Sequence, residues 1–425
     1  MNKNISKIKP LKGEITIPAD KSVSHRAVMF ASLAKGISTI KNFSSGADCH
    51  STVNLFKQLG INIEFLDSKT LRIEGRDLQY SKEPLQAGNS GTTMRLVSGI
   101  LAGQNFESIL IGDESLSKRP MKRIIEPLRL MGADISSMDG KAPLYIKGTS
   151  LKGIDYLSPI SSAQVKSCIL LAGLNKSTVG TTKYTESYKS RNHSELMLKY
   201  LGADINTVGN SVIINPSELS AKDIEIIGDI SSAAFFIVAG LIVEGSDITI
   251  KNVGINETRT GILDIVQRMN GNVELLNKRN ISGEDVADIR VRYTDGLKAC
   301  EIFGADIPKL IDELPVIAVL ASQADGDTII RDAGDLRNKE ADRISCLVTE
   351  LKKIGINIDE AKDGFVVHGK TTLKGNAELN VYHDHRLAMS FFIAGLICEN
   401  EIVVKDFEWT NISFPEFEEL FNTLL

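Results

Sequence analysis

The sequence predicts an α/β protein with mixed sheets, built of two lobes that each contain three copies of one strand–helix unit. The first observation is a recurring run of small and branched apolar residues, followed by a short polar turn and a strand-like run. The turns lie near Gly36, Gly103, Thr178, Gly245, Gly326 and Asn400. The second observation is a short element in phase with the first: LGINI, MGADI, LGADI, MNGNV and IGINI begin at Leu59, Met131, Leu201, Met269 and Ile354. Because a period of roughly 65–80 residues is too long for the common solenoids, we expect two globular lobes with a cleft between them.

The composition is that of an ordinary globular protein. The chain has 425 residues, of which 42% are apolar and 24% are charged, enough for two domains. The net charge of −5 lacks the basic excess that general nucleic-acid binding requires. The longest apolar run, Ala233 to Val243, is about half the length that spans a bilayer, and the first residues lack the apolar segment of a secretory signal. The cysteines show no zinc-binding spacing. We expect a reduced, cytoplasmic protein that binds neither nucleic acid nor a membrane.

Each repeat is expected to contain helices on one face of a mixed sheet. The alternating segments after Gly60, Gly132 and Gly202 each contain a turn and are typical of β-hairpins. Periodic apolar residues before them, as in CHSTVNLFKQLG and SELMLKYLG, predict helices that end at the glycine. We place the N-terminal lobe at 18–226 and the C-terminal lobe at 1–17 plus 227–425, with the early strand GEITIP pairing into the C-terminal lobe.

Two helix starts near the N-terminus could bind anions. In IPADKSVSHRA, a helix is expected to begin near Ser22 or Ser24, with Lys21 and Arg26 beside its free backbone N–H groups. In QAGNSGTTMR, Gly91 follows a tight turn where small side chains let a ligand approach the backbone. Taken alone, a capped helix with solvated charges also explains the first segment, and an ordinary glycine-rich helix entry explains the second.

Two further segments offer groups for a polar, anionic ligand. In SLSKRPM, Pro120 restricts the preceding residue, Arg119, to an extended backbone. The guanidinium of Arg119 suits bidentate binding of a carboxylate or phosphate. In SSAQVKS, capping explains one of Ser161 and Ser162. It does not explain Gln164, whose amide can both donate to and accept from a polyhydroxyl ligand.

The C-terminal half contains two segments in which acidic residues accompany a helix. Asp312 and Glu313 open an apolar helix in IDELPV, where the helix dipole or a general-base role explains them equally well. In RNKEADR, Lys339, Glu340 and Arg343 fall at helical spacing, as in a surface ladder of salt bridges. Each segment is ambiguous by itself.

A last segment, YHDHRLAM, places His385 and Arg386 at the start of a buried helix. Its His-x-His pattern lacks a third zinc ligand, so anion binding is the favoured interpretation. Six of the seven segments fall at or near the N-terminal end of a repeat helix. Together they predict a cleft that collects helix N-termini and cationic side chains for a polyanionic ligand.

These motifs resemble those of the 3-phosphoshikimate 1-carboxyvinyltransferase (EPSP synthase) family. DKSVSHRA, GNSGTTMR, SLSKRPM, SAQVKS, IDELPV, RNKEADR, YHDHRLAM and ISFPEF follow the family's order from Lys21 to about Phe417. The resemblance implies the enolpyruvyl transferase fold, a two-lobed inside-out α/β barrel of six βαβαββ units. It implies transfer of the enolpyruvyl group of phosphoenolpyruvate to the 5-hydroxyl of shikimate 3-phosphate, a step toward chorismate and the aromatic amino acids. It also implies that no metal or organic cofactor takes part.

The resemblance also implies roles for the residues at matching positions. Asp312 would be the base for the 5-hydroxyl, Lys339 its neighbour, and Lys21 with Glu340 the pair that protonates and deprotonates the methylene group. Implied contacts to shikimate 3-phosphate are Lys21, Ser22, Arg26, Ser162, Ala163, Gln164, Arg191, Asp312 and Lys339. Implied contacts to phosphoenolpyruvate are Lys21, Gly91, Arg119, Gln164, Arg343 and Arg386, with Asn89 and His385 nearby.

One position departs from the family pattern, and two alternative functions stay open. Many relatives carry a lysine before the C-terminal [ST]-F-P, where this chain has Ile412, so the last phosphate contact is either missing or supplied elsewhere. The uncrowded Gly91 leads us to expect inhibition by glyphosate. We expect a monomer whose lobes close on the substrates. The first alternative is the UDP-N-acetylglucosamine enolpyruvyl transferase, whose usual reactive cysteine is absent before Arg119-Pro120. The second is an inactive anion-binding scaffold, which the presence of Asp312, Lys339 and Glu340 argues against.

Overall fold

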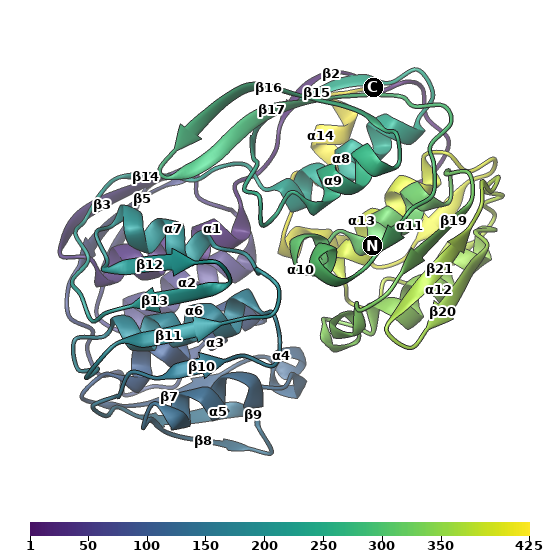
Figure 1. The fold of residues 1–425 in the computed structure, drawn as a ribbon. Coiled ribbons are helices and arrows are strands. Elements are labelled where there is room, and N and C mark those ends of the chain that lie inside the picture. The colour runs from purple at the N-terminus through teal and green to yellow at the C-terminus, as the bar shows by residue number, and fades with distance from the viewer. The chain divides into compact units, whose positions relative to one another are not determined.

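The protein divides into two compact units (Figure 1). The computed structural model describes all residues from 1 to 425. The N-terminal unit comprises Ala19–Ile226 and Ile281–Glu284, and the C-terminal unit comprises Met1–Pro18, Ile227–Asn280 and Asp285–Leu425. No sequence pattern indicates the short segment Ile281–Glu284. No helix of the protein is both long and apolar enough to span a membrane.

The N-terminal unit contains three four-stranded sheets with one plan. In each, an edge strand runs parallel to the second strand, and the third strand is antiparallel to both of its neighbours. The sheets are β14 (Ile224–Glu225), β3 (Gly36–Lys41), β5 (Thr70–Gly75) and β4 (Asn62–Asp67); β6 (Leu85–Gln86), β7 (Glu107–Ile111), β9 (Lys141–Lys147) and β8 (Asp134–Met138); β10 (Asp155–Leu157), β11 (Thr182–Thr185), β13 (Ser211–Ile214) and β12 (Ile205–Val208). The three predicted hairpins are β4–β5, β8–β9 and β12–β13.

The C-terminal unit repeats this plan twice in full and once in shortened form. Its four-stranded sheets are β16 (Asn272–Ile281), β17 (Glu284–Arg292), β15 (Asp247–Gly254) and β2 (Lys12–Thr16); β18 (Glu301–Ile302), β19 (Asp327–Ile330), β21 (Gly364–His368) and β20 (Ile358–Ala361). The last sheet has three strands, β22 (Glu378–Leu379), β23 (Ile402–Val404) and β1 (Lys3–Ile5). The six sheets therefore confirm the predicted repeat and fold class.

The first and fourth repeats exchange their leading strands. β2 precedes the first repeat helix in sequence but pairs with β15, which follows the fourth. Conversely, β14 precedes the fourth repeat helix and pairs with β3, which follows the first. In the other four repeats, the strand before the helix pairs in parallel with the strand after it. The expected pairing of GEITIP within the C-terminal unit is confirmed.

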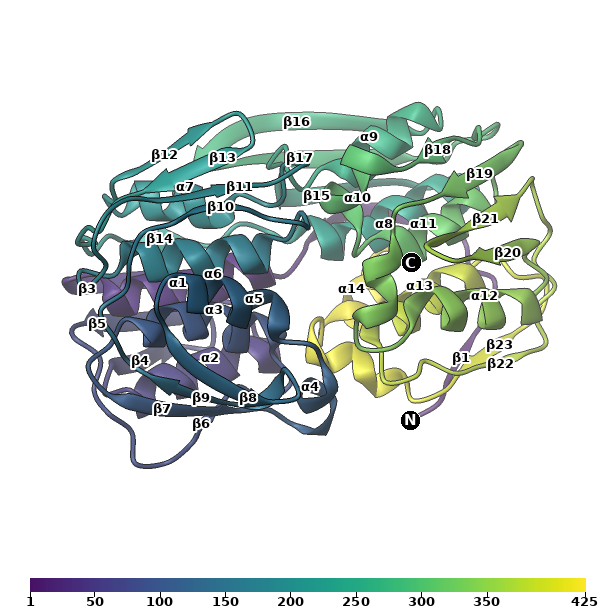
Figure 2. The ribbon, with the colours of Figure 1, turned by 60° about the horizontal axis from the view of Figure 1, so that its bottom comes forward.

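The first helix of each repeat forms the core of its unit. These helices are α1 (Lys21–Leu33), α3 (Gly91–Ala102), α6 (Ala163–Leu174), α8 (Ile230–Ile242), α11 (Leu314–Ala321) and α13 (His385–Gly395). They are buried along almost their whole length. In α8 and α11 this follows from residues that are small or branched and apolar on nearly all faces. In the N-terminal unit α3 packs along α6 and contacts α1; in the C-terminal unit α11 packs against α8 and α13 (Figure 2).

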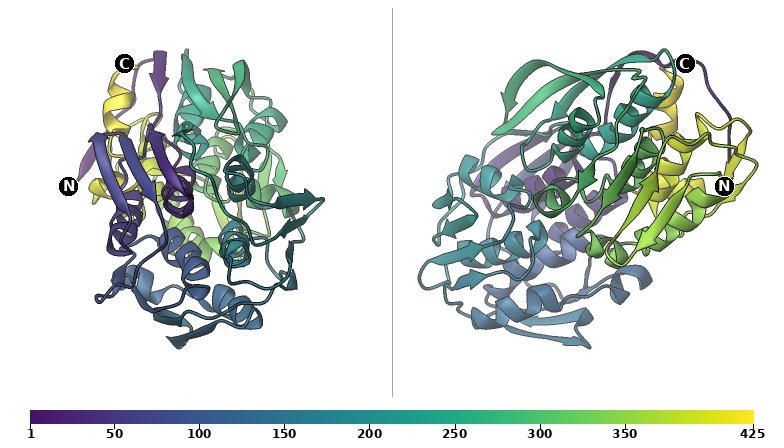
Figure 3. Two further views of the ribbon diagram at one scale, coloured as in Figure 1. Left: turned by 90° about the vertical axis from the view of Figure 1, so that its left-hand side faces the viewer. Right: turned by 45° about the vertical axis from the view of Figure 1, so that its right-hand side comes forward.

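The second helix of each of the first five repeats packs outside this core. These helices are α2 (Ala47–Gln58), α5 (Lys122–Leu130), α7 (His193–Tyr200), α9 (Gly261–Arg268) and α12 (Arg343–Lys353). Shorter helical segments are α4 (Glu114–Lys118), α10 (Ile307–Leu310), α14 (Phe417–Asn422), η1 (Gly304–Asp306), η2 (Gly334–Asn338) and η3 (Phe407–Ile412). Figure 3 shows from two further sides that, in the N-terminal unit, strands face outward and helices lie within.

All five second helices end at the predicted repeat element. Their C-caps are Leu59, Met131, Leu201, Met269 and Ile354, the first residues of that element. The next residue adopts a positive φ, which favours glycine because it has no Cβ. Four copies have glycine there, with φ from 84° to 97°, and the fourth copy has Asn270 with φ 62°. Asparagine is the side chain that best tolerates this conformation after glycine.

Candidate active site

The first helix of the N-terminal unit begins beside an ion pair. Asp20 is its N-cap and accepts a hydrogen bond from the backbone N–H of Val23 at 2.8 Å. The helix therefore starts next to Ser22, as expected, but its cap is Asp20 and not a serine, because aspartate caps a helix as well as serine does. Lys21, the first helical residue, places Nζ 2.6 Å from Oδ2 of Asp48, and its side chain is 24% exposed. This charge-assisted contact positions the ammonium while leaving it accessible to a ligand.

Arg26 joins three helices of the N-terminal unit. Its guanidinium donates to the backbone oxygen of Ser22 at 2.9 Å, to Oγ of Ser167 at 3.0 Å and to Oγ of Ser194 at 2.7 Å. Ser167 lies in α6 and Ser194 in α7. The residue is only 3% exposed. These contacts hold the buried guanidinium where the three helices meet.

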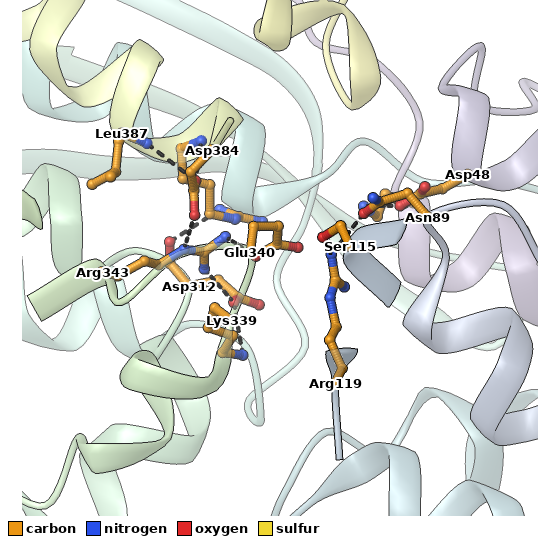
Figure 4. Close-up of polar contacts among 12 residues, drawn as sticks. Asp48, Asn89, Ser115, Arg119, Asp312, Lys339, Glu340, Arg343, Asp384 and Leu387 are labelled. Atoms are coloured by element: carbon orange, nitrogen blue, oxygen red, sulfur yellow. Dashed lines mark hydrogen bonds and ion pairs between the residues drawn. The ribbon is translucent and has the colours of Figure 1, made fainter. Parts of the chain in front are cut away.

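The start of α3 brings a glycine and two arginines together. Gly91 is the first helical residue, after the N-cap Ser90. A Cβ added at Gly91 would lie 3.2 Å from Nη1 of Arg95 and 3.5 Å from Nη1 of Arg119. Arg119 also donates to Oδ1 of Asn89 at 2.6 Å (Figure 4). The structure thus places three of the predicted residues, Gly91, Arg119 and Asn89, around one small space.

The start of α6 is tied to α3 by the predicted glutamine. Ser162 is the N-cap of α6, without a side-chain capping bond, and Ala163 is its first residue. Gln164 accepts a hydrogen bond from Nη1 of Arg95 at 2.5 Å and donates to Oγ1 of Thr92 at 3.0 Å. The amide therefore donates and accepts, although in this structure its partners belong to the protein.

A buried lysine anchors the loop that carries Arg191. Lys166, two residues after Gln164, is 1% exposed. Its Nζ lies 2.9 Å from Oε1 of Glu186, 2.8 Å from Oε1 of Glu195 and 3.1 Å from the backbone oxygen of Ser190. Arg191, which is half-buried, is the residue after Ser190 and lies just before α7. The sequence did not indicate this buried cluster.

In the C-terminal unit, Arg343 holds three carboxylates (Figure 4). Its Nε lies 2.6 Å from Oδ2 of Asp384, its Nη2 2.6 Å from Oε2 of Glu340 and its Nη1 3.4 Å from Oδ1 of Asp312. Burial alone would lower the pKa of Arg343, but the carboxylates of Asp384, Glu340 and Asp312 outweigh it and hold that pKa above its ordinary value. The guanidinium therefore stays charged and fixes the carboxylates in place.

Asp312 and Lys339 form the more accessible part of this cluster. Nζ of Lys339 lies 3.3 Å from Oδ1 of Asp312, and their side chains are 24% and 14% exposed. The expected helical spacing of Lys339, Glu340 and Arg343 is wrong, because α12 begins only at Arg343, after the N-cap Asp342. Lys339 and Glu340 lie in the preceding loop. A loop can direct Lys339 and Glu340 toward Asp312 without the constraint of helical spacing.

Arg386 is held at the start of α13 by the residues before α11. Its Nη1 donates to the backbone oxygen of Asp312 at 3.1 Å and lies 3.7 Å from Oε1 of Glu313. The first residue of α13, His385, is buried, whereas the ring of His383 stacks on Trp409 with centroids 4.7 Å apart. The two histidines of the His-x-His pattern therefore have different surroundings.

Sequence reasoning missed some of the residues that arrange these sites. Asp384 is fully buried, caps α13 by accepting from the N–H groups of Arg386 and Leu387, and binds Arg343. Its position before a helix was a usable capping signal. Asp48 and Arg95 gave no signal, because their partners Lys21 and Gln164 are distant in sequence. Ile412, where many relatives carry a lysine, is half-buried at the end of η3 and supplies no charge.

The chain is similar to known proteins over nearly its whole length. The family model described as EPSP synthase (3-phosphoshikimate 1-carboxyvinyltransferase) matches residues 5–421. A 3-phosphoshikimate 1-carboxyvinyltransferase of Citrifermentans bemidjiense is 50% identical over 425 residues, covering 99% of this chain and 98% of that protein. The protein of the same name from Thermoanaerobacter sp. strain X514 is 49% identical, covering 100% of both chains.

Solved structures show the same similarity. The EPSP synthase of Acinetobacter baumannii superposes with a TM-score of 0.88 at 40% identity, covering 100% of this chain and 98% of that one. The enolpyruvyl transferase NikO of Streptomyces tendae superposes with a TM-score of 0.81, covering 99% and 96% of the two chains. At 18% identity, the second comparison supports the fold alone.

Proposed function

The chain belongs to the EPSP synthase (3-phosphoshikimate 1-carboxyvinyltransferase) family, and from this premise we propose that it transfers the enolpyruvyl group of phosphoenolpyruvate to the 5-hydroxyl of shikimate 3-phosphate, releasing phosphate. The observation that carries the proposal within the structure is the cluster around Arg343. It holds Asp312 and Glu340, two carboxylates proposed for separate proton transfers, beside the ammonium of Lys339.

In the proposed first step, the 5-hydroxyl oxygen bonds to C2 of phosphoenolpyruvate, and its proton passes to Asp312. The methylene carbon C3 takes up a proton from the pair formed by Lys21 and Glu340, which gives a tetrahedral ketal phosphate. In the second step, the bond from C2 to the phosphate oxygen breaks, and C3 returns a proton to the same pair, so the double bond is restored. Fixed carboxylates stabilise the cationic character that develops at C2, and cations stabilise the departing phosphate.

The binding roles divide between the units. In the N-terminal unit, Lys21, Ser22, Arg26, Ser162, Ala163, Gln164 and Arg191 are proposed to hold shikimate 3-phosphate, while Lys21, Gly91, Arg119 and Gln164 hold phosphoenolpyruvate. In the C-terminal unit, Asp312 and Lys339 are proposed to contact the shikimate ring, and Arg343 and Arg386 the phosphoenolpyruvate. We propose that both groups act on the same pair of substrates, with Asn89 and His385 nearby.

A phosphate-release assay with both substrates tests the proposal. Release is expected only when phosphoenolpyruvate and shikimate 3-phosphate are both present, because the ketal needs both. UDP-N-acetylglucosamine in place of shikimate 3-phosphate tests the related transferase activity, for which no release is expected. Release with the sugar nucleotide alone, or binding of shikimate 3-phosphate without turnover, would contradict the proposal.

The role of Asp312 gives a specific prediction. Asp312→Ala is expected to lower kcat by roughly a hundredfold, the contribution of a positioned general base. The matched control is Asp359→Ala, since Asp359 is an exposed aspartate of the same unit whose partners are Lys352 and His368, outside the proposed site. Steady-state kinetics with circular dichroism of both variants checks the result. A loss smaller than about threefold in kcat, against the larger factors typical of general bases, would move the base role to another residue.

A further inference from the structure

A chain of buried polar side chains connects three helices in the N-terminal unit. Nδ1 of His25 lies 2.6 Å from Oγ1 of Thr52, which lies 2.7 Å from Oγ1 of Thr93, which lies 2.7 Å from Oγ of Ser90. His25 belongs to α1, Thr52 to α2 and Thr93 to α3, and Ser90 is the N-cap of α3. None of the four is more than 1% exposed. Solvent therefore cannot replace any link of this chain.

The direction of these hydrogen bonds follows from the number of protons available. Thr93 Oγ1 donates to Ser90 Oγ, which also accepts from the backbone N–H of Thr93. Because a hydroxyl has one proton to donate, Thr93 must accept from Thr52, and Thr52 must in turn accept from His25. Nδ1 of His25 is therefore the protonated nitrogen, and Nε2 faces a buried position without a hydrogen-bond partner. A second proton on Nε2 would be buried without an acceptor, so the neutral ring is favoured.

The chain fixes positions that matter for the proposed function. α1 supplies Lys21, α2 supplies its partner Asp48, and α3 begins at Gly91, near Arg119. A shift of the α3 start relative to α1 would move the contacts proposed for phosphoenolpyruvate. It would leave α1 in place, with Lys21, Ser22 and Arg26, three of the contacts proposed for shikimate 3-phosphate. Links through fully buried hydroxyls are sensitive to such shifts, since a broken link leaves an unsatisfied polar group.

We propose that His25, as its neutral Nδ1–H tautomer, is a positioning residue that sets the start of α3 relative to α1 and α2 through Thr52 and Thr93, and so determines the affinity for phosphoenolpyruvate. This inference rests on the proposed function. In the proposed function His25 contacts no substrate. It acts through the hydrogen bonds that run from its Nδ1–H through Thr52 and Thr93 to Ser90.

Two matched pairs of variants test the proposal. The amide nitrogen of His25→Asn falls near the place of Nδ1 and keeps the donor, whereas that of His25→Gln reaches toward Nε2 and loses it. Thr52→Ser keeps the hydroxyl, whereas Thr52→Val removes it at the same size. His25→Gln and Thr52→Val are each expected to raise the KM for phosphoenolpyruvate roughly tenfold, as expected for one buried hydrogen bond. The KM for shikimate 3-phosphate should stay within about twofold, and His25→Asn and Thr52→Ser should resemble the parent protein.

The double variant separates a shared chain from independent packing defects. Because both changes break the same chain, His25→Gln with Thr52→Val should raise the KM no more than either change alone. Ser32→Ala is the control: this hydroxyl is buried in the same helix without a hydrogen-bond partner, so no kinetic change is expected. Equal KM values for His25→Asn and His25→Gln, or a joint rise in both KM values, would overturn the proposal.

Nitrogen chemical shifts of the His25 ring provide a measurement that does not depend on activity. Nitrogen-15 NMR of the full chain is expected to show a protonated Nδ1 and a bare Nε2 at neutral pH. The opposite tautomer, or a charged ring, would overturn the inference even in an active enzyme. Failure of the proposed function would instead appear as no phosphate release by the unmodified protein, with the His25 tautomer unaffected.

Discussion

One buried arginine determines the arrangement of the acidic side chains in the C-terminal unit. Arg343 is 1% exposed and lies within 2.6 Å of both Asp384 and Glu340. Removal of one member of such a group leaves an uncompensated buried charge, which costs more than the loss of one surface ion pair. A rigid cluster of this kind keeps Asp312 at a defined place for the proton transfer that we propose for it.

Gly91 gives a prediction about inhibition. Glyphosate is expected to compete with phosphoenolpyruvate in the parent protein. Gly91→Ala should raise its inhibition constant roughly tenfold or more, the effect of one methyl group in a tight pocket. The new methyl would lie 3.2 Å from Nη1 of Arg95 and 3.5 Å from Nη1 of Arg119, close enough to occupy the space beside them. Inhibition kinetics at varied phosphoenolpyruvate provides the measurement.

Gly334→Ala is the control for this substitution. Its Cβ would meet only Cβ of Asp363, at an ordinary 3.6 Å. Weak, purely non-competitive inhibition of the parent protein, or equal inhibition of Gly91→Ala, would contradict the prediction.

The ring of His25 should also make stability depend on pH. Burial lowers the pKa of His25 to about 3, with the charges of Asp48, Lys21, Arg26 and Asp20 around it. Below its ordinary value of about 6.5, the unfolded chain binds a proton that the folded protein refuses, so stability falls as pH falls. The parent protein should lose up to about 1.4 kcal/mol per pH unit relative to His25→Asn. Urea unfolding at about pH 7 and about pH 5 measures this difference; parallel losses in both proteins would contradict it.

At the scale of elements, helix starts carry most of the chemistry. Each of α1, α3, α6, α12 and α13 begins at or next to a residue proposed to bind substrate. Side-chain caps fix four of these starts: Asp20, Ser90, Asp342 and Asp384 accept hydrogen bonds from backbone N–H groups of the first turn. A cap therefore orients the first turn and the side chains it presents.

Two of these caps differ in one respect that can be measured. Asp342 and Asp384 both cap helices of the C-terminal unit and both pair with an arginine, but only the partner of Asp384 is fully buried; Arg337, the partner of Asp342, is 28% exposed. Asp342→Ala is expected to cost about 1 kcal/mol of unfolding free energy, and Asp384→Ala about 3–5 kcal/mol. Urea unfolding of both variants provides the comparison. Similar costs would mean that Arg343 finds another partner when Asp384 is removed.

The sequence predicted the elements better than the partners of its polar residues. The repeat elements at Leu59, Met131 and Ile354 correctly marked helix ends, because a glycine after the last apolar residue is a local signal. Asp20 and Lys339 show the limit. Which of Asp20 and Ser22 caps α1, and whether Lys339 lies in a loop or in a helix, depends on tertiary contacts. Buried pairs such as Lys166 with Glu186 had no local signal at all.

At the scale of the whole molecule, the proposed contacts are divided between two units. Lys21 and Arg119 belong to one, and Arg343 and Arg386 to the other. Because cationic groups repel until an anion arrives, binding of both substrates is expected to change the relative arrangement of the units. X-ray scattering with and without both ligands measures the change, with unphosphorylated shikimate as the control. Superimposable curves in all conditions would exclude substrate-driven closure.

The exchange of β2 and β14 has a consequence for synthesis on the ribosome. The N-terminal unit receives its edge strand β14 at the end of its own main segment, so its three sheets can form while later residues are still being made. The strands β1 and β2 have no such partner among the residues of the N-terminal unit. β2 can pair only after β15 has been made, and β1 only after β23 has been made. Both strands therefore stay unpaired until these later residues have been synthesised.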